Sequence, residues 1–309
     1  MLTPSPRTIR KARTIDTSGF SSTVFYTRFG LGVGDTDWLD FRLALFQAVT
    51  LPSISRYCAH GAQWVIFTDT WLPPAQDRAL RHAVHRTSGS VNIRVEPIDM
   101  MVQMRQRMES LVSDRDLVTL VKIDDDDALS DDFLDLVPRE PGLVTLPHGL
   151  EVIWADQVHR PKAHPFLSMN TAATLPPHLV RDFVRVSHSD VGKWTRAQGL
   201  PVSVVGEAPP TYLYGRHPLA DTGYADHRLA VMEDPRKADL TRKQIRRFGI
   251  DRRALSEWSQ LVSRTPGLKQ TKTWELSHAL NRASLEHLDH VETLHQQIWE
   301  STSDLLQGD

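Results

Sequence analysis

The sequence predicts an α/β protein with a mostly parallel sheet flanked by helices, and three observations support this fold class. Strand-like and helix-like apolar patterns alternate through the first half of the chain. Residues 117–123 are apolar on both faces except for Lys122, which is typical of a central strand in a parallel sheet. Polar residues directly follow several predicted strands, at the edge where such sheets bind their ligands.

The first three elements are predicted by short apolar runs. Residues 24–26 are a β-rich run. Residues 41–49 carry apolar side chains at helical spacing, with Asp40 placed to cap the helix and Pro52 to end or kink it. Residues 63–68 are a compact apolar run, which predicts a buried strand.

The next four elements continue the alternation. Pro73 and Pro74 open a helix that runs through Val84, because proline is favoured in the first turn. Residues 91–98 read as a strand, and residues 100–111 as a helix rich in Met and Arg. The strand at 117–123 follows, so four strands and three helices are expected before residue 124.

The second half is less regular. Residues 142–146 and 152–154 predict a hairpin, and residues 201–205 predict a short strand. Further on, Asp251 is placed to cap a helix that runs through Leu261.

Composition limits the class of protein. The chain has 309 residues, of which 40% are apolar, as in an ordinary globular protein of one or two domains. Its single cysteine, Cys58, excludes an internal disulfide framework and a cysteine-built zinc site. The net charge of -2 argues against a general nucleic-acid binder. We also expect no transmembrane segment, because no apolar run approaches the ~18 residues that one needs.

We expect three parts along the chain. Residues 1–19 are basic and lack the apolar region of a secretory signal, so they predict a disordered tail or, alternatively, an organellar transit peptide. Residues 20–237 form the main α/β domain, and residues 238–309 form a helical extension. An apolar stripe at 274–306 predicts either packing onto the main domain or a homodimer contact through these helices.

Four consecutive carboxylates follow the strand at 117–123: Asp124, Asp125, Asp126 and Asp127. Two unit charges ~4 Å apart repel by about 4 kcal/mol at an effective dielectric near 20, so this cluster needs a cation, strong solvation or protonation. If the strand pattern continues, Asp124 and Asp126 share one face and suit a hard divalent ion such as Mg²⁺ or Mn²⁺.

The same run has plainer interpretations. It can be a solvated loop, or the start of a helix capped by Ser130. An EF-hand is excluded, because the glycine at loop position six and the glutamate at position twelve are both absent.

These residues resemble a known family. The segment KIDDDDAL at 122–129 is similar to the DxD segment of GT-A glycosyltransferases. The segments FYTRFG at 25–30 and WVIFTD at 64–69 are similar to a bacterial rhamnosyltransferase family. The resemblance covers residues 24–217 and implies that residues 20–237 form a GT-A-like catalytic domain.

The resemblance implies a nucleotide-diphosphate sugar donor, a divalent cation (Mn²⁺ or Mg²⁺), and an acceptor hydroxyl on a glycan or lipid-linked molecule. It places Asp124 near the donor ribose and the metal, and Asp126 on the metal itself. Asp125 is assigned to the donor pocket in the same way.

Other donor contacts follow from the same resemblance. Arg28 and Asp69 lie where the family lines its nucleotide pocket, and Arg107 lies near a donor-pocket arginine, although Arg105 fits nearly as well. Asn170 falls in the segment expected under the donor sugar. The alternatives are a solvated helix face or loop for the arginines and an ordinary turn for Asn170.

Asp190 is the candidate general base, because the resemblance places it where inverting enzymes carry an acidic pair at a helix start. The usual acidic neighbour is replaced by Ser189, and a plain helix cap is the alternative role of Asp190. Glu207 and Asp156 are the substitutes if Asp190 has no catalytic role.

The resemblance also assigns a role near the end of the domain. His217 matches the position of a histidine that contacts the metal or the diphosphate, and Arg216 is an alternative contact for the phosphates.

The function expected is therefore an inverting, metal-dependent glycosyltransferase, with rhamnose as the sugar only through the resemblance. Two alternatives stay open: a metal-dependent nucleotidyl- or phosphotransferase, and a carbohydrate-binding protein without catalysis. The glycine-rich loop at 30–34 lacks the GxxxxGK[ST] pattern of a phosphate loop, which weighs against the former. We expect a cytoplasmic location, either free or peripheral to the inner membrane face.

Overall fold

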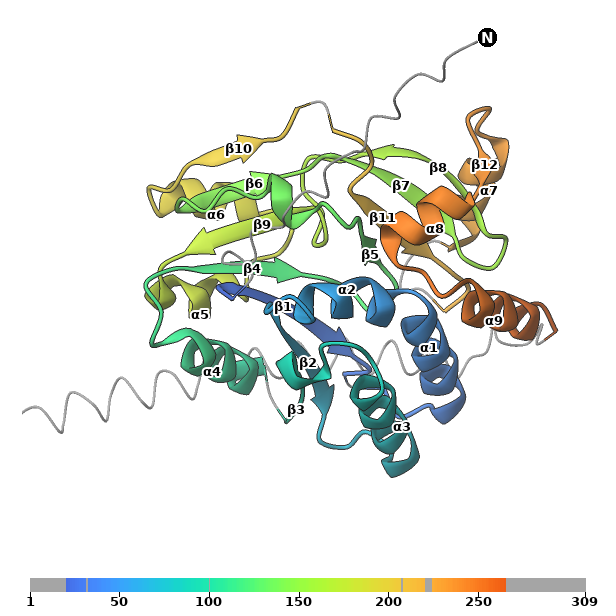
Figure 1. Cartoon of the computed structure of the whole chain (residues 1–309), viewed down its shortest axis with the longest axis horizontal. Coiled ribbons are helices and arrows are strands. Elements are labelled where there is room, and N and C mark those ends of the chain that lie inside the picture. The colour runs from blue at the N-terminus through green and yellow to red at the C-terminus, as the bar shows by residue number, and fades with distance from the viewer. Residues whose placement is uncertain (1–20, 32, 100, 207, 220–223, 265–309) are drawn as a thin grey trace, which may run out of the picture.

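The structure is a computed structural model that describes residues 21–31, 33–99, 101–206, 208–219 and 224–264 (Figure 1). Two sheets and their covering helices make up this part of the chain. The basic tail at 1–19 and the apolar stripe at 274–306 lie outside the described residues.

The larger sheet has seven strands in the described part, in the order β10-β6-β9-β4-β1-β2-β3. Every neighbouring pair is parallel except the two pairs that β9 forms with β4 and β6. This confirms the predicted mostly parallel sheet. The strand bounds are β1 (Thr23–Phe29), β2 (Gln63–Asp69), β3 (Ile93–Ile98), β4 (Val118–Lys122), β6 (Gly142–Thr145), β9 (Thr171–Leu175) and β10 (Val202–Val204).

Helices cover both faces of this sheet (Figure 1). One face packs against α1 (Thr36–Ala48), α2 (Thr50–Cys58) and α3 (Pro74–His85). The other packs against α4 (Met101–Val112), α5 (Val180–Phe183) and α6 (Val191–Ala197). Because β1 and β4 are covered on both sides, nearly all their residues are buried, as their continuous apolar runs predict.

The first helical segment starts and breaks differently from its prediction. Asp35, not Asp40, caps α1 by accepting the backbone N–H of Trp38 at 3.0 Å. Asp40 lies inside the helix and accepts a hydrogen bond from Gln76 Nε2 at 2.8 Å. The break between α1 and α2 falls at Val49, before Pro52, because proline is tolerated in the first turn of the new helix.

The second sheet has the order β12-β8-β7-β11-β5. Its strands are β5 (Ala128–Leu129), β7 (His148–Ile153), β8 (Val158–Ala163), β11 (Tyr212–Arg216) and β12 (Ala238–Asp239). The predicted hairpin of residues 142–146 with 152–154 is wrong. The first run pairs with β9 and β10 in the larger sheet, whereas the second pairs with β8 and β11, because the chain changes sheets between β6 and β7.

The remaining helices pack on the second sheet and on α1. They are α7 (Tyr224–Glu233), α8 (Arg242–Phe248) and α9 (Arg252–Arg264), with short 3-10 turns η2 (Ser90–Asn92), η3 (Leu134–Leu136) and η4 (Pro177–Leu179) elsewhere. Asp251 caps α9 as predicted, since its Oδ1 accepts two backbone N–H groups at 3.0 Å. Phe248 and Trp258 share one apolar cluster with Leu45 of α1, so residues up to 264 in the expected extension pack on the main domain. None of the helices in the described ranges is long and apolar enough to span a membrane.

Candidate functional site

The four aspartates lie at the carboxyl edge of the larger sheet, directly after β4. They form a turn in which the backbone N–H of Asp127 donates to the carbonyl of Asp124 at 3.3 Å. The chain then enters β5, which pairs with β11 of the second sheet. The alternative of a helix that starts at Ser130 is not found, and the strand-like alternation of Asp124 and Asp126 is wrong, because the turn redirects the chain and gives each carboxylate its own surroundings.

Asp125 is paired with a buried arginine of α1. Arg42 Nε donates to Asp125 Oδ2 at 3.1 Å, and Arg42 Nη2 donates to Asp125 Oδ1. This two-point fork is the strongest geometry available to an arginine and a carboxylate. Burial raises the pKa of Asp125 to about 6, against the opposing effect of the Arg42 charge.

Asp126 contacts the same arginine and His217. Its Oδ2 lies 3.0 Å from His217 Nε2 and 3.5 Å from Arg42 Nη1. Burial alone raises the pKa of Asp126, but the charge of Arg42 and the hydrogen bond from His217 outweigh burial and lower the pKa to about 2. The predicted meeting of Asp126 and His217 is thus present in the structure.

The hydrogen bonds of His217 define its tautomer. Its Nδ1 accepts the backbone N–H of Leu219 at 3.1 Å, so in the neutral ring the proton is on Nε2 and is donated to Asp126. The ring is fully buried and lies nearly perpendicular to the ring of Trp258 of α9, with 6.2 Å between the ring centroids.

Asp127 is buried beneath the turn. Its Oδ1 accepts the backbone N–H of Gly215 in β11 at 2.7 Å. Burial, followed by the charges of Asp126 and Asp124, raises the pKa of Asp127 well above its ordinary value. Asp127 therefore links the two sheets and does not face solvent.

Asp124 differs from the other three because its side chain is 42% exposed. Its Oδ1 lies 4.0 Å from Lys122 Nζ. Burial lowers the pKa of Lys122, and the charge of Asp124 opposes that shift. Asp124 and Lys122 thus form the accessible side of the acidic segment.

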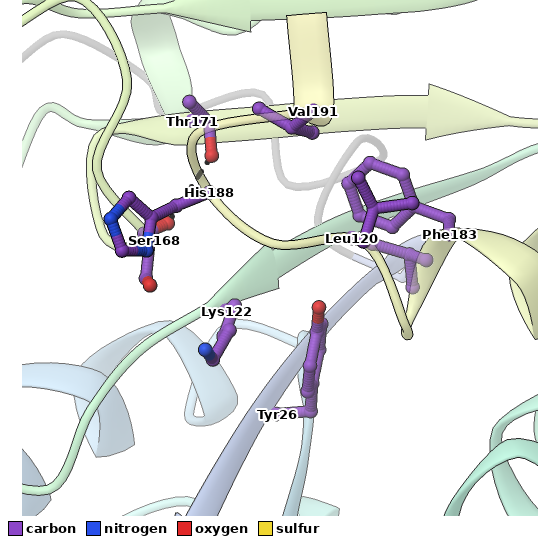
Figure 2. Close-up of a pocket in the computed structure, with 9 residues that line it drawn as sticks. Tyr26, Leu120, Lys122, Ser168, Thr171, Phe183, His188 and Val191 are labelled. Carbon is purple, nitrogen blue, oxygen red and sulfur yellow. Dashed lines mark hydrogen bonds between the residues drawn. The ribbon is translucent and has the colours of Figure 1, made fainter. Parts of the chain in front are cut away.

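Lys122 projects into a pocket at this edge of the sheet (Figure 2). Tyr26 and Lys122 enter from the strands, and His188 and Ser168 enter from loops on the opposite side (Figure 2). The space holds about 320 Å³, including its open mouth. Its wall is completed by Leu120, Thr171, Phe183, Val186 and Val191. The lining is therefore mainly apolar, with polar groups at a few positions.

Asp190 lies between two residues that line this pocket, His188 and Val191. Its Oδ2 accepts a hydrogen bond from Ser187 Oγ at 2.7 Å, and its side chain makes no capping bond to α6. Burial and the charge of Lys122 lower the pKa of His188, whereas the charges of Asp124 and Asp190 oppose that shift. His188 is therefore close enough to Lys122, Asp124 and Asp190 for their charges to affect its pKa.

The pairing of β1 with β2 and β4 brings two further predicted residues to the same edge. Tyr26 pairs with Lys122, and Phe29 pairs with Thr68. Because alternate residues of a strand share a face, Arg28 and Asp69 face the same side of the sheet as Tyr26. Arg28 is half-buried, and its charge lowers the pKa of both Tyr26 and Lys122.

The other predicted donor contacts have different surroundings. Arg107 is exposed on α4, whereas Arg105 of the same helix is buried. Asn170 is fully buried: its Oδ1 accepts the N–H of Leu167, and its Nδ2 donates to the carbonyl of His164, both at 2.7 Å. Both polar groups of Asn170 are thus used within its own loop.

The substitute bases and Arg216 are placed as follows. Asp156 is held by Arg228 through two hydrogen bonds of 2.7 and 3.0 Å, and Glu207 lies outside the described residues. Arg216 is buried, with its guanidinium 4.0 Å from the ring centroid of Tyr214. Its charge also lowers the pKa of Asp126, so it belongs to the surroundings of the acidic turn.

The possible metal ligands at this turn do not fit the divalent metal that the GT-A resemblance implies. Asp126 and His217 are together, but Asp124 is not joined to them, and no group of three His, Cys, Asp or Glu side chains in the described ranges could hold a metal ion. The guanidinium of Arg42 pairs with Asp125 and lies 3.5 Å from Asp126, where a cation would be expected.

Sequence reasoning missed Arg42, Tyr26 and His188. For Arg42 a signal was present: it lies three residues after Leu39 and four before Phe46, on the apolar side of the helix. A charge at such a position implies a buried partner. No comparable sequence pattern identifies His188, because its position at the pocket depends on how the loop before α6 folds over β4.

Three comparisons with known proteins were made. The search of curated proteins gives no match. A solved structure described as "Structure of a Cytidylyltransferase from Leptospira borgpetersenii serovar Hardjo-bovis (strain JB197)" aligns with a TM-score of 0.33 and 10% identity, over 81% of this chain and 97% of that one. A likeness at this level supports no conclusion about chemistry.

The family comparison is more informative. Its match covers the acidic turn and helices α1 to α4, but it is shorter than the 24–217 range of the sequence resemblance. Residues 33–147 match the family described as "Putative rhamnosyl transferase", which confirms the family resemblance found in the sequence.

Proposed function

We propose that this protein is an inverting glycosyltransferase that moves a sugar from a nucleotide-diphosphate donor to an acceptor hydroxyl. The observation that carries the proposal is the mainly apolar pocket at the carboxyl edge of β4, with the charged groups Lys122, Asp124 and Asp190 around it. The family match over residues 33–147 supports a sugar as the transferred group, with rhamnose as the first candidate.

The pocket has suitable chemistry for such a ligand. Phe183 and Val191 offer an apolar wall for the methyl group of a deoxyhexose. Ser168 offers a hydroxyl to the sugar, and Thr171 Oγ1, whose proton is donated within its own loop, can accept from a sugar hydroxyl. Such a division between apolar wall and few polar groups is typical of small-molecule sites.

Cations on the same side of the sheet suit the donor phosphates. Lys122 enters the pocket, and Arg28 is close enough to lower the pKa of Lys122. We assign Lys122 and Arg28 to the diphosphate, and Asp69 and Asp124 to the nucleoside, since all four lie at the carboxyl edge where α/β sheets bind nucleotides.

Asp190 is the proposed general base. It is exposed beside the pocket, and its Oδ1 is available for an acceptor hydroxyl while Ser187 holds Oδ2. In the transfer step, the acceptor oxygen bonds to the anomeric carbon and its proton passes to Asp190. The bond from the anomeric carbon to the diphosphate oxygen breaks, and the nucleoside diphosphate leaves with the electron pair.

Substrate screening tests the proposal. Nucleotide sugars are added to the full chain, and thermal stability is measured together with nucleoside-diphosphate release and the anomeric configuration of the product. A ligand present well above its Kd should stabilise the fold by a few kcal/mol. We expect a deoxyhexose donor to bind and the product to have the inverted configuration.

Asp190→Asn should keep donor binding and lose turnover, whereas Asp182→Asn, which changes an exposed carboxylate on neighbouring α5, should keep both. Release of inorganic diphosphate would instead indicate nucleotidyl transfer. Binding without transfer to any glycan or lipid-linked acceptor would indicate a non-catalytic carbohydrate-binding protein.

A further inference from the structure

We infer that Arg42 is the fixed cation of the acidic turn and fills the position that a divalent metal would need between Asp126 and His217. The inference concerns a site distinct from the pocket, and it deepens the proposed function in one respect: sugar transfer would then proceed without a metal at this turn.

The first support is the number of groups that one guanidinium contacts. Arg42 forms a two-point fork with Asp125, and its Nη1 lies 3.5 Å from Asp126 Oδ2. The guanidinium is planar and permanently charged, so it neutralises carboxylates on two sides without needing further ligands.

The second support is the burial of these groups. Asp125, Asp126 and His217 are each at most 8% exposed, and so is Arg42. An ion entering from solvent would have to displace the guanidinium or lie against its like charge. Buried carboxylates are stable only when they are paired, and Arg42 already provides that pairing.

The third support is the tautomer of His217. A metal binds a ring nitrogen through its lone pair, which must be free of a proton. Nδ1 uses its lone pair on the N–H of Leu219, and Nε2 therefore carries the proton that it donates to Asp126. In this arrangement His217 acts as a hydrogen-bond donor to the turn.

The surroundings hold Arg42 in place. Its guanidinium carbon lies 5.3 Å from the ring centroid of Trp38, one turn earlier in α1. The ring of Trp258 lies nearly perpendicular to that of His217, and its indole N–H donates to the carbonyl of Phe41 at 3.0 Å. Helices α1 and α9 thus hold both partners of Asp126.

Metal binding to the full chain tests the inference directly. Mn²⁺ is titrated into wild type and Asp126→Asn, and free Mn²⁺ is followed by electron paramagnetic resonance. We expect the two proteins to give the same titration curve. A Mn²⁺ ion bound by wild type and lost in Asp126→Asn would overturn the inference.

Removal of the guanidinium provides a second measurement. Arg42→Ala should unfold at a lower temperature than wild type, and it should gain a Mn²⁺ site at least about tenfold tighter than any in wild type. That gain should disappear in Arg42→Ala/Asp126→Asn. The control is Arg228→Ala, which removes a similar two-point pair with Asp156 elsewhere and should gain no site.

If Arg42→Ala does not fold, the comparison of wild type with Asp126→Asn still decides the question. Activity is measured separately, in excess chelator. We expect an unchanged transfer rate, and loss of transfer that Mn²⁺ restores would overturn the inference. Absence of transfer under every condition would contradict the proposed function instead, while the Mn²⁺ titrations would still test Arg42.

Discussion

Gly215 donates its backbone N–H to Asp127 Oδ1 across 2.7 Å, which joins β11 of the second sheet to the acidic turn of the first. A Cβ on Gly215 would overlap the carbonyl of Asp126 and the indole nitrogen of Trp154. The backbone of β11 thus approaches the turn more closely than any side-chain-bearing residue allows.

Gly215→Ala is therefore expected to displace the turn and to destabilise the fold by about 1–3 kcal/mol, as overpacking does. Urea denaturation of the two proteins measures the difference. Gly34→Ala is the control, because a Cβ there meets nothing within 4 Å. Equal effects of the two substitutions would show that the close approach at Gly215 is not a constraint.

Trp258→Ala is expected to cost about 3–5 kcal/mol, because the ring is buried among α1, α9 and the second sheet. Loss of the ring also leaves the Phe41 carbonyl without its indole donor. Leu261→Ala, on the same helix but half exposed, should change stability by less than about 0.5 kcal/mol. Thermal or urea unfolding checks both values, and a small loss for Trp258→Ala would mean that α9 adds little to the core.

Glu151→Gln is expected to change the response of stability to acid. Glu151 is fully buried, and burial alone would raise its pKa, but the hydrogen bond from Arg160 and the charge of Lys162 outweigh it and lower the pKa. A lowered pKa in the folded state adds stability above the unfolded-state pKa of 4.5, and that stability is lost as the pH falls through the folded-state value.

Wild type should therefore lose more stability between neutral and acid pH than Glu151→Gln, which is itself weaker by roughly 1–3 kcal/mol at neutral pH. Urea unfolding at several pH values gives the free energy of unfolding as a function of pH, and hence its slope, for both proteins. Glu257→Gln, whose side chain is 65% exposed, should keep the slope of wild type. If Glu151→Gln kept the wild-type slope, the lowered pKa of Glu151 would be contradicted.

Lys122→Gln is expected to weaken donor binding by about tenfold or more, since one charge-assisted contact to phosphate is lost. Isothermal titration with the donor found by screening measures the change in Kd. Lys193→Gln alters an exposed lysine on α6 and should leave the Kd unchanged. If both variants bind as tightly as wild type, Lys122 has no contact with the donor.

The first half of the fold could be predicted from local patterns. Each buried strand there is a continuous apolar run, and each helix carries a stripe, so β2, β4 and α3 form close to their expected bounds. The second sheet could not be predicted, because β5, β7 and β11 pair only after the acidic turn and Pro147 redirect the chain.

The site was predictable to a similar extent. Strand ends place Arg28, Asp69 and the acidic segment at one edge, as α/β sheets require. The surroundings of each aspartate were not predictable, because Arg42 is 83 residues from Asp125 in sequence. Asn170 shows the reverse case, in which a polar residue expected at a ligand is used by its own loop.

The reversed direction of β9 has a consequence for how this molecule can diversify. Since β9 runs opposite to β4, its beginning adjoins the pocket, and Ser168 and Thr171 come from that beginning. A longer or shorter connection from β8 to β9 would change only the part of the cavity wall that this connection forms. Tyr26 and Lys122 belong to the parallel strands β1 and β4 and would stay in place. Under the proposed function, selectivity for the sugar would therefore change without loss of the proposed contact between Lys122 and the donor phosphates.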